Sequence, residues 1–495
     1  MPPDSTDQHL DLLDGAAAGP AAIRGSVLRV AVYAIGLALA LVSMPLLVRH
    51  LGQAAFGEYF TVISLAAVVS GLTEGGIGVL ATREFTTTTG REREQVLGIL
   101  LGIRLSLSIA GGAVIILFAW LVGYSSPMVL GTLVAAAGMV IQTLQAVFAV
   151  PLQGGLRLGS VAAVDLARQF VSVGLIIVLV LLGAGIVPLL AVSIPAAVVS
   201  LLLTIAFVRR IALYRPRLEF ARWGPLLREA GLLGVAVAVN TLYFRVAVVG
   251  MSLLGTPIET GYFSTAFQFV AVMLAVPALT IASVFPILVR AGGRDGERLW
   301  SASTRLIELA LLTGGAIMVL LQTGSSLVIA IVGGASAAPA APVLAVLAVS
   351  VLATFMTYAA TTVLTSIGRY RALLVINLLG LVVSSLLLAA LIPRYQAIGA
   401  AFAVSASECV LAVLSVAILR SSGVESRLPW RPLAKIGAVL AGSLIAGVVL
   451  SGHDFLAPVV SGALLIVGVL VTGLLPPELV HALDLRAYFR RAGQV

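Results

Sequence analysis

The chain has 495 residues, of which 60% are hydrophobic and only 10% are charged, and its mean hydropathy is +1.13. A soluble domain of this composition could not cover its surface with polar atoms, so that class is excluded. The formal net charge is +9, but no RNA- or DNA-binding module accompanies it. The composition therefore predicts a membrane protein that binds no nucleic acid.

Long apolar segments recur along the chain, and most charged residues fall between them. A helix needs about 20 apolar residues to cross a bilayer. The pattern predicts an all-α polytopic membrane protein with about fourteen crossing helices. The predicted spans are 27–48, 58–80, 96–121, 127–150, 161–182, 186–208, 230–254, 262–289, 303–322, 341–364, 372–392, 397–419, 433–451 and 456–475. The longest external segment, about 323–340, is too small for a catalytic domain.

The basic residues predict the orientation of these helices. If both termini are cytoplasmic, only Arg49 and Arg394 of the 30 Lys and Arg residues fall in external segments. This asymmetry follows the positive-inside rule. The basic side also faces the anionic headgroups of membrane lipids. We therefore expect a multi-pass membrane protein with both termini in the cytoplasm. The excess of Arg over Lys, 29 to 1, is typical of a GC-rich bacterial genome and predicts the bacterial cytoplasmic membrane.

Three pairs of short motifs predict an internal repeat. They recur in order, in corresponding helices, at offsets of 203, 201 and 212 residues. The pairs are Leu51-Gly52 to Gly57 with Leu254-Gly255 to Gly261, Arg104-Leu105 with Arg305-Leu306, and Arg157 to Asp165 with Arg369 to Asn377. Each half would contain six helices, an even number, so both halves would have the same orientation in the membrane. Such bundles are expected to enclose a central cleft and to rock about it.

The repeat predicts the organisation of the whole chain. The last two helices fall outside it and are expected to pack peripherally. The predicted parts are a disordered cytoplasmic tail at 1–22, an N-terminal bundle at 23–208, a basic cytoplasmic linker at 209–229, a C-terminal bundle at 230–420, an extra transmembrane hairpin at 433–475 and a cytoplasmic tail at 476–495.

Arg245 is the most informative polar residue within a predicted span. It lies about fifteen residues into its helix, too deep for its side chain to reach the cytoplasmic headgroups easily. No acidic residue lies three or four positions away, whereas Asn240 and Tyr243 lie nearby on the same helix. A charge at this depth is costly unless it faces a cavity or a partner. It therefore predicts either a water-filled cleft that receives an anion or an ion pair with another helix.

Other charged residues within the spans allow more than one interpretation. Arg104 either reaches the headgroups or lines the cleft. Two acidic residues each have an arginine three positions away on the same helix. Each such pair is expected to form an ion pair on one helix face. These pairs are Asp165 with Arg168, and Arg305 with Glu308. Arg305 is a further candidate for binding substrate, and the ion-coupling candidates are Glu74, Asp165, Glu308 and Glu408.

The basic linker at 209–229 mixes six arginines with Leu, Phe and Trp223. It predicts either an amphipathic surface helix or a solvated segment. Cys409 is the sole cysteine, so no internal disulfide is possible. The sequence shows no phosphate-binding loop, zinc motif or nucleophile elbow, and we expect no cofactor, no metal and no enzymatic activity.

Several motifs together resemble a known family. They are Pro45-Leu46-Leu47-Val48-Arg49-His50-Leu51-Gly52 followed by Phe56-Gly57-Glu58-Tyr59, then Tyr243-Phe244-Arg245, Gly261-Tyr262-Phe263-Ser264-Thr265-Ala266, Phe285-Pro286, Ile392-Pro393-Arg394-Tyr395 and Gly399-Ala400-Ala401. In order and helix placement they resemble the polysaccharide-transporter, or oligosaccharide flippase, branch of the multidrug/oligosaccharidyl-lipid/polysaccharide (MOP) exporter superfamily. The resemblance covers about residues 25–420.

The resemblance implies a flippase that moves polyprenyl-pyrophosphate-linked oligosaccharides to the outer leaflet, for surface polysaccharide assembly. It also implies a polysaccharide polymerase and glycosyltransferases as partners. Arg245 matches an arginine often found in this helix. The chain departs from the family pattern at Ala247, where an acid is frequent, and at Gln268, where a basic residue is frequent.

Two alternatives stay open. One is a cation-coupled multidrug exporter of the same superfamily. It would more typically need a deep carboxylate in the first helix or in the region of the seventh and eighth. The other is a membrane polysaccharide polymerase or glycosyltransferase, which generally needs a sizeable external loop. Neither feature is evident in this chain.

Overall fold

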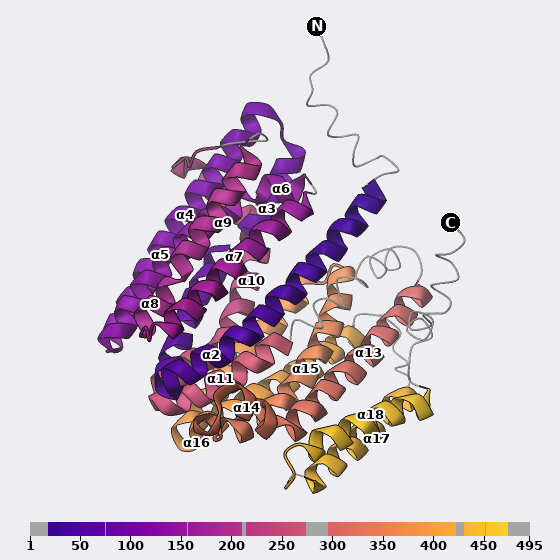
Figure 1. Ribbon diagram of the computed structural model, residues 1–495. Coiled ribbons are helices and arrows are strands. Elements are labelled where there is room, and N and C mark those ends of the chain that lie inside the picture. The colour runs from indigo at the N-terminus through magenta and orange to yellow at the C-terminus, as the bar shows by residue number, and fades with distance from the viewer. Residues whose placement is uncertain are drawn as a thin grey trace, which may run out of the picture. The chain divides into compact units, whose positions relative to one another are not determined.

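The protein is helical throughout the residues that the computed structural model describes, which are 18–74, 76–155, 157–209, 214–273, 296–421, 430–450 and 452–473 (Figure 1). These residues contain no strand. In a bilayer the backbone polar groups must find partners within the chain, and a helix satisfies them locally. The predicted all-α fold class is thus confirmed. The predicted tails lie largely outside the described residues, and residues 274–295 lie wholly outside them.

The helices follow the apolar segments of the sequence. In the first half they are α2 (Ala18–Glu74), α3 (Ile77–Thr87), α4 (Gly90–Leu121), α5 (Ser126–Phe148), α6 (Val150–Gly154), α7 (Leu158–Leu181), α8 (Ile186–Ala191), α9 (Ser193–Val208) and α10 (Phe220–Leu254). In the second half they are α11 (Pro257–Met273), α13 (Gly296–Thr323), α14 (Ser325–Gly333), the 3-10 turn η2 (Ala335–Ala337), α15 (Ala340–Ser366), α16 (Tyr370–Ser421), α17 (Trp430–Val449) and α18 (Leu456–Thr472).

Within the described residues, ten helices are long and apolar enough to cross a membrane. Two of these segments, 34–87 and 371–421, contain 54 and 51 residues, more than twice the length of one crossing. Each contains a backbone break, at Gly52 with φ 73° and at Gln396 with φ 49°. The breaks divide α2 and α16 into two crossings each. With the shorter helices α11 and α18, the described helices follow the fourteen predicted spans in order.

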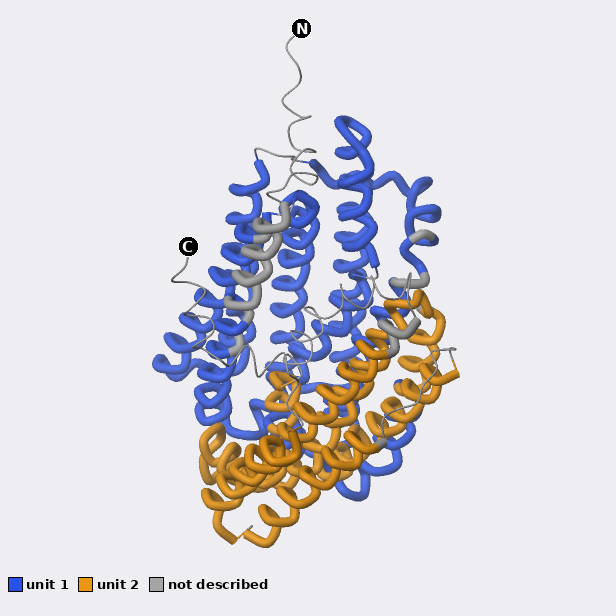
Figure 2. The backbone as a smooth tube through the Cα atoms, turned by 90° about the vertical axis from the view of Figure 1, so that its right-hand side faces the viewer, with its two compact units in different colours: residues 1–265, 381–397 blue, residues 266–380, 398–495 orange. Residues whose placement is uncertain are grey.

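The chain forms two compact units, coloured separately in Figure 2. The first comprises residues Met1–Thr265 and Leu381–Ala397, and the second comprises Ala266–Gly380 and Ile398–Val495. In the first unit α2 packs against α4, α5, α7 and α10. In the second, α13 packs against α15, and the hairpin of α17 and α18 packs on α13. The predicted repeat of six-helix bundles stays a prediction.

A third break lies between α2 and α3. Gly76 has a left-handed conformation with φ 74°, which glycine adopts without steric cost. α2 ends at Glu74 and α3 begins at Ile77, within a 54-residue apolar segment. Glu74, the last residue of α2, is therefore placed beside this break.

Candidate functional site

Arg245 lies on α10 and faces α2 in the first unit. Its guanidinium carbon is 5.9 Å from the centroid of the buried Phe60 ring. This distance is just within the limit of about 6 Å for a cation–π interaction. Phe60 in turn stacks on Phe56, with ring centroids 6.1 Å apart. The Arg245 guanidinium thus packs on an aromatic ring. This contact holds the side chain without neutralising its charge.

No carboxylate among the described residues lies within 4.0 Å of the Arg245 guanidinium, and the side chain is half-buried. Of the two interpretations of this residue, an ion pair with another helix therefore finds no support in the described part of the chain. Tyr243 is buried and contacts the Phe244 ring edge-on, and Asn240 is half-buried on the same helix. The polar residues predicted around Arg245 thus lie on one helix of one unit.

Arg104 and Glu74 form an ion pair that links α4 to the end of α2. An Arg104 guanidinium nitrogen is 3.7 Å from a Glu74 carboxylate oxygen. The Arg104 side chain is only 6% exposed, whereas that of Glu74 is 52% exposed. Arg104 therefore does not extend into solvent, and Glu74 partly compensates its charge. The Nε atom of Arg104 is buried and has no hydrogen-bond partner among the described residues.

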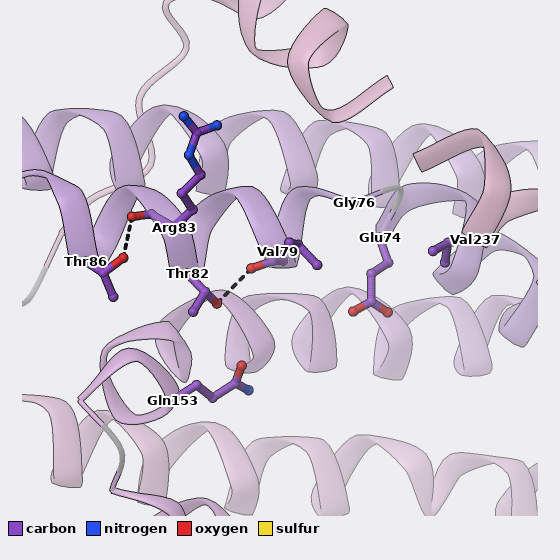
Figure 3. Close-up of a pocket in the computed structure, with 9 residues that line it drawn as sticks. Glu74, Gly76, Val79, Thr82, Arg83, Thr86, Gln153 and Val237 are labelled. Carbon is purple, nitrogen blue, oxygen red and sulfur yellow. Dashed lines mark hydrogen bonds between the residues drawn. The ribbon is translucent and has the colours of Figure 1, made fainter. Parts of the chain in front are cut away.

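A cavity of about 590 Å³ opens beside this ion pair (Figure 3). Its lining residues come from α2, α3, α6, α10 and the break between α2 and α3: Glu74, Gly76, Gly78, Val79, Thr82, Arg83, Thr86, Gln153 and Val237. Glu74, Thr82 and Gln153 extend into the same space, whereas Arg83 extends away from it (Figure 3). A half-exposed carboxylate thus borders a water-accessible cavity within a predicted crossing segment.

Hydroxyl groups continue the polar contacts between these helices. Ser108 on α4 donates to Thr143 on α5 at 3.1 Å, and it lies 3.4 Å from the hydroxyl oxygen of Thr73 on α2. All three side chains are buried. Hydrogen bonds between helices stabilise packing in a bilayer, where apolar contact alone provides little drive for association. The helices that position Glu74 and Arg104 are thereby tied together.

The remaining predicted residues lie on α7, α13 and α16. Asp165 and Arg168 are both half-buried on α7. In the second unit, Arg305 is exposed and Glu308 is half-buried on α13, while Glu408 on α16 is buried. The described part of the first unit thus contains two groupings, around Arg245 and around Glu74. Their roles in transport and ion coupling stay predictions.

Some residues that shape these groupings have no sequence signal that marks them as functional. Phe60 supports Arg245, and Thr82 and Gln153 line the cavity. Phe60 belongs to a motif of the predicted repeat. Its contact partner Arg245 lies 185 positions away on another helix, so no local sequence pattern could reveal the contact. Thr82 within α3 and Gln153 within α6 are polar helix residues that no sequence motif marks.

Comparison with known proteins places the chain in a family. The sequence model of the family described as "Polysaccharide biosynthesis protein" matches residues 22–292, which is more than half of the chain. No curated protein sequence matches the chain significantly.

Solved structures share the fold. The structure of the lipid II flippase MurJ in an inward closed conformation has a TM-score of 0.72 at 14% identity, over 90% of this chain and 98% of that one. An inward-facing MATE multidrug resistance transporter of the MOP superfamily has a TM-score of 0.62 at 16% identity, over 80% and 99% of the chains. An outward-facing MATE transporter of the same superfamily has a TM-score of 0.56 at 17% identity, over 82% of this chain and 96% of that one. The chain therefore belongs to the polysaccharide biosynthesis protein family and has the helical fold of the MOP superfamily.

Proposed function

We propose that the protein moves polyprenyl-pyrophosphate-linked oligosaccharide units across the bacterial cytoplasmic membrane by alternating access, for assembly of surface polysaccharide. The observation that carries this proposal is Arg245, a half-buried arginine on a crossing helix with no described carboxylate within 4.0 Å. Family membership and the fold shared with a lipid II flippase support a lipid-linked substrate.

The chemistry of a lipid-linked pyrophosphate suits this residue. The lipid tail can stay in the bilayer, so only the charged head and the sugars need a polar path. Arginine remains protonated at any physiological pH, and its planar fork donates two parallel hydrogen bonds to a phosphate group. The Phe60 ring contacts the guanidinium without occupying its hydrogen-bond donors. Arg245 is thus proposed to bind the pyrophosphate, with Asn240 and Tyr243 beside it.

The proposal is tested in proteoliposomes that contain a fluorescent polyprenyl-pyrophosphate oligosaccharide. Translocation is measured as the fraction of fluorophore that an added impermeant reductant can reach over time. We expect the purified protein to raise the rate above that of protein-free vesicles. A fluorescent phosphatidylcholine in parallel vesicles controls for general lipid scrambling and should not move faster. No protein-dependent movement of the glycolipid would refute the proposed substrate.

A second candidate function is a cation-coupled multidrug exporter, and one observation favours it. The half-exposed Glu74 carboxylate, which can pair with a cationic compound, borders a cavity of about 590 Å³. The fold shared with MATE transporters is compatible with this function. The two candidates differ in a direct assay. An exporter would move a cationic dye across the same vesicles and leave the glycolipid in place, and Glu74→Gln would abolish that dye movement.

A further inference from the structure

We propose that the segment from residue 214 to residue 228 forms a binding site for the headgroups of anionic phospholipids. Its backbone docks on α4, and this contact holds its arginines in place. The proposal concerns the membrane leaflet around the protein and is independent of the transported substrate. It rests on three observations: a docked backbone, apolar anchors at both ends, and a cationic surface flanked by exposed apolar side chains.

The first observation is the docking of residues 214–219 against α4. These residues form no helix, and the backbone N–H of Arg217 donates to the carbonyl of Gly98 at 2.9 Å. A methyl group on Gly102 would lie 2.2 Å from the Arg217 carbonyl oxygen, and one on Gly98 would lie 2.7 Å from that of Arg215. Any larger residue at either position would displace the segment. The Gly-x-x-x-Gly spacing at 98–102 thus provides the groove in which the backbone lies.

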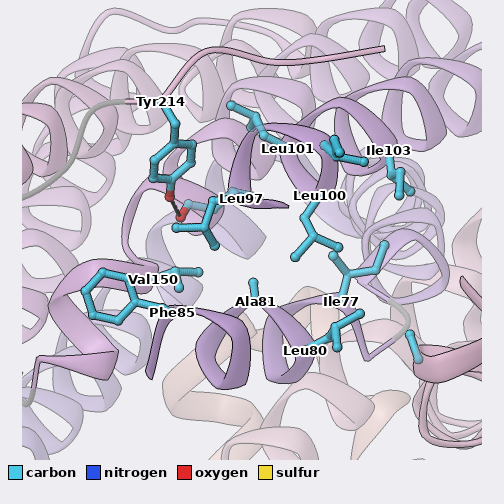
Figure 4. Close-up of a cluster of buried hydrophobic side chains, with 13 residues drawn as sticks. Ile77, Leu80, Ala81, Phe85, Leu97, Leu100, Leu101, Ile103, Val150 and Tyr214 are labelled. Carbon is cyan, nitrogen blue, oxygen red and sulfur yellow. Dashed lines mark hydrogen bonds between the residues drawn. The ribbon is translucent and has the colours of Figure 1, made fainter. Parts of the chain in front are cut away.

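The second observation is that both ends of the segment are anchored in one hydrophobic cluster (Figure 4). Tyr214 is buried there, its hydroxyl donates to the Val147 carbonyl at 2.5 Å, and its ring stacks on Phe148 at 5.3 Å. Burial raises the pKa of the Tyr214 phenol, which therefore stays protonated and keeps this hydrogen bond. At the other end, Trp223 and Leu226 on α10 pack against the same cluster.

The third observation is what this anchored segment exposes. Its exposed cations are Arg215, Arg217, Arg222 and Arg228. Glu219 lies 3.6 Å from Arg217 and 3.8 Å from Arg222. Neither Arg215 nor Arg228 has a carboxylate within 4.0 Å among the described residues. The surface therefore keeps a net positive charge that can accept anions.

Exposed apolar side chains distinguish a lipid from a soluble anion as the occupant. Leu218 is 59% exposed and Phe220 is 67% exposed, and both lie between the arginines in the sequence. A phosphate ion would leave them in water, whereas a phospholipid would cover them with its acyl chains while its phosphate meets the guanidinium groups. Because the backbone is already held, little conformational freedom is lost on binding.

The experiment measures phosphatidylglycerol binding to the purified full-length protein in detergent, by native mass spectrometry and by thermal unfolding. The variant R215Q/R228Q removes two exposed charges without touching the anchored residues. The control variant R371Q/R420Q removes two exposed arginines of α16, with the same change in net charge. We expect R215Q/R228Q to weaken phosphatidylglycerol binding by roughly tenfold and the control to change it by less than about twofold.

Further arms test the docking and the identity of the lipid. Gly102→Leu keeps every arginine but fills the groove, so it should also weaken binding. Tyr214→Phe, which loses only the hydroxyl, covers the case in which Gly102→Leu fails to fold, and it should weaken binding to a smaller extent. The proposal is overturned if R215Q/R228Q binds like the wild type or the control loses as much. It is also overturned if inorganic phosphate stabilises the protein equally, or if polyprenyl pyrophosphate binds and phosphatidylglycerol does not.

Discussion

Gly57 on α2 and Gly261 on α11 pack backbone against backbone. A methyl group on Gly57 would lie 2.7 Å from the amide nitrogen of Gly261, and one on Gly261 would lie 2.0 Å from the carbonyl oxygen of Gln53. Thr265, one turn later, donates a hydrogen bond to the Gln53 side chain at 3.2 Å. Gly57 and Gly261 belong to the two motifs that the predicted repeat pairs, at 51–57 and 254–261. These two motifs thus contact each other directly.

This contact predicts that Gly261→Ala destabilises the protein. The added methyl group meets backbone atoms, which can move only if α2 and α11 separate, and overpacking of this kind costs about 1–3 kcal/mol. The measurement is the thermal unfolding temperature in detergent. Gly174→Ala is the control, because Gly174 is an exposed glycine of α7 with open space around it. An unchanged unfolding temperature for Gly261→Ala would contradict the close contact.

The ion pair between Glu74 and Arg104 predicts that substitutions at the two positions have non-additive effects on stability. Glu74→Leu leaves a buried guanidinium without compensation, and we expect a loss of about 1–3 kcal/mol, below the range for fully buried pairs because Glu74 is half-exposed. Arg104→Met added to Glu74→Leu removes the orphaned charge and should recover most of that loss. The double-mutant cycle, measured by thermal or denaturant unfolding, gives the coupling. Additive losses would show that the two residues do not stabilise each other.

If Arg245 binds the pyrophosphate head, its charge and its fork geometry should both affect transport. Arg245→Ala should abolish glycolipid translocation and leave protein levels near normal. Arg245→Lys should keep partial activity, because it retains the charge but loses the bidentate hydrogen bonds. Arg245→Glu should be as inactive as alanine, since it repels the anion. Arg371→Ala serves as the control. Normal translocation by Arg245→Ala would exclude this residue from the mechanism.

The predicted topology is tested with single cysteines in a Cys409→Ala background. Cysteines at Arg91 and Pro216 should resist an impermeant thiol reagent added to intact cells, because both positions are predicted to be cytoplasmic. A cysteine at Arg394, in a predicted external segment, should be labelled. All three positions are exposed on the protein, so accessibility depends on the side of the membrane. Labelling at the first two positions from outside would reverse the orientation.

The hairpin of α17 and α18 is expected to be dispensable for the core. It packs on α13 through a cluster that includes Val319, Ile436 and Leu465. Truncation after Arg431 should leave a folded and partly active protein of lower abundance, because apolar packing surface on α13 becomes exposed to lipid. Abundance and dispersity are measured by size-exclusion chromatography, and activity by translocation. An abundant, monodisperse but inactive product would contradict a peripheral role.

The length and spacing of the apolar segments determine much of the fold. In a bilayer each such segment must satisfy its own backbone as a helix, so the number and order of crossings follow from composition. The sequence also places Arg245 deep within a helix and identifies it as costly unless it faces a partner or a polar space. Local spacing suffices for these conclusions because helix formation is a local process.

Only the tertiary structure decided which helix faces meet. Glu74 and Arg104 lie thirty positions apart on different helices, and their sequence surroundings allowed a headgroup contact or a cleft equally well. The pairing of Gly57 with Gly261 and the docking of Arg217 on Gly98 likewise join residues distant in the chain. Lipid is as apolar as the helices, so association depends on close backbone approach at small residues and on a few polar contacts. Such contacts depend on the rotation of each helix about its axis, which hydrophobic periodicity does not specify when a helix is apolar on every side.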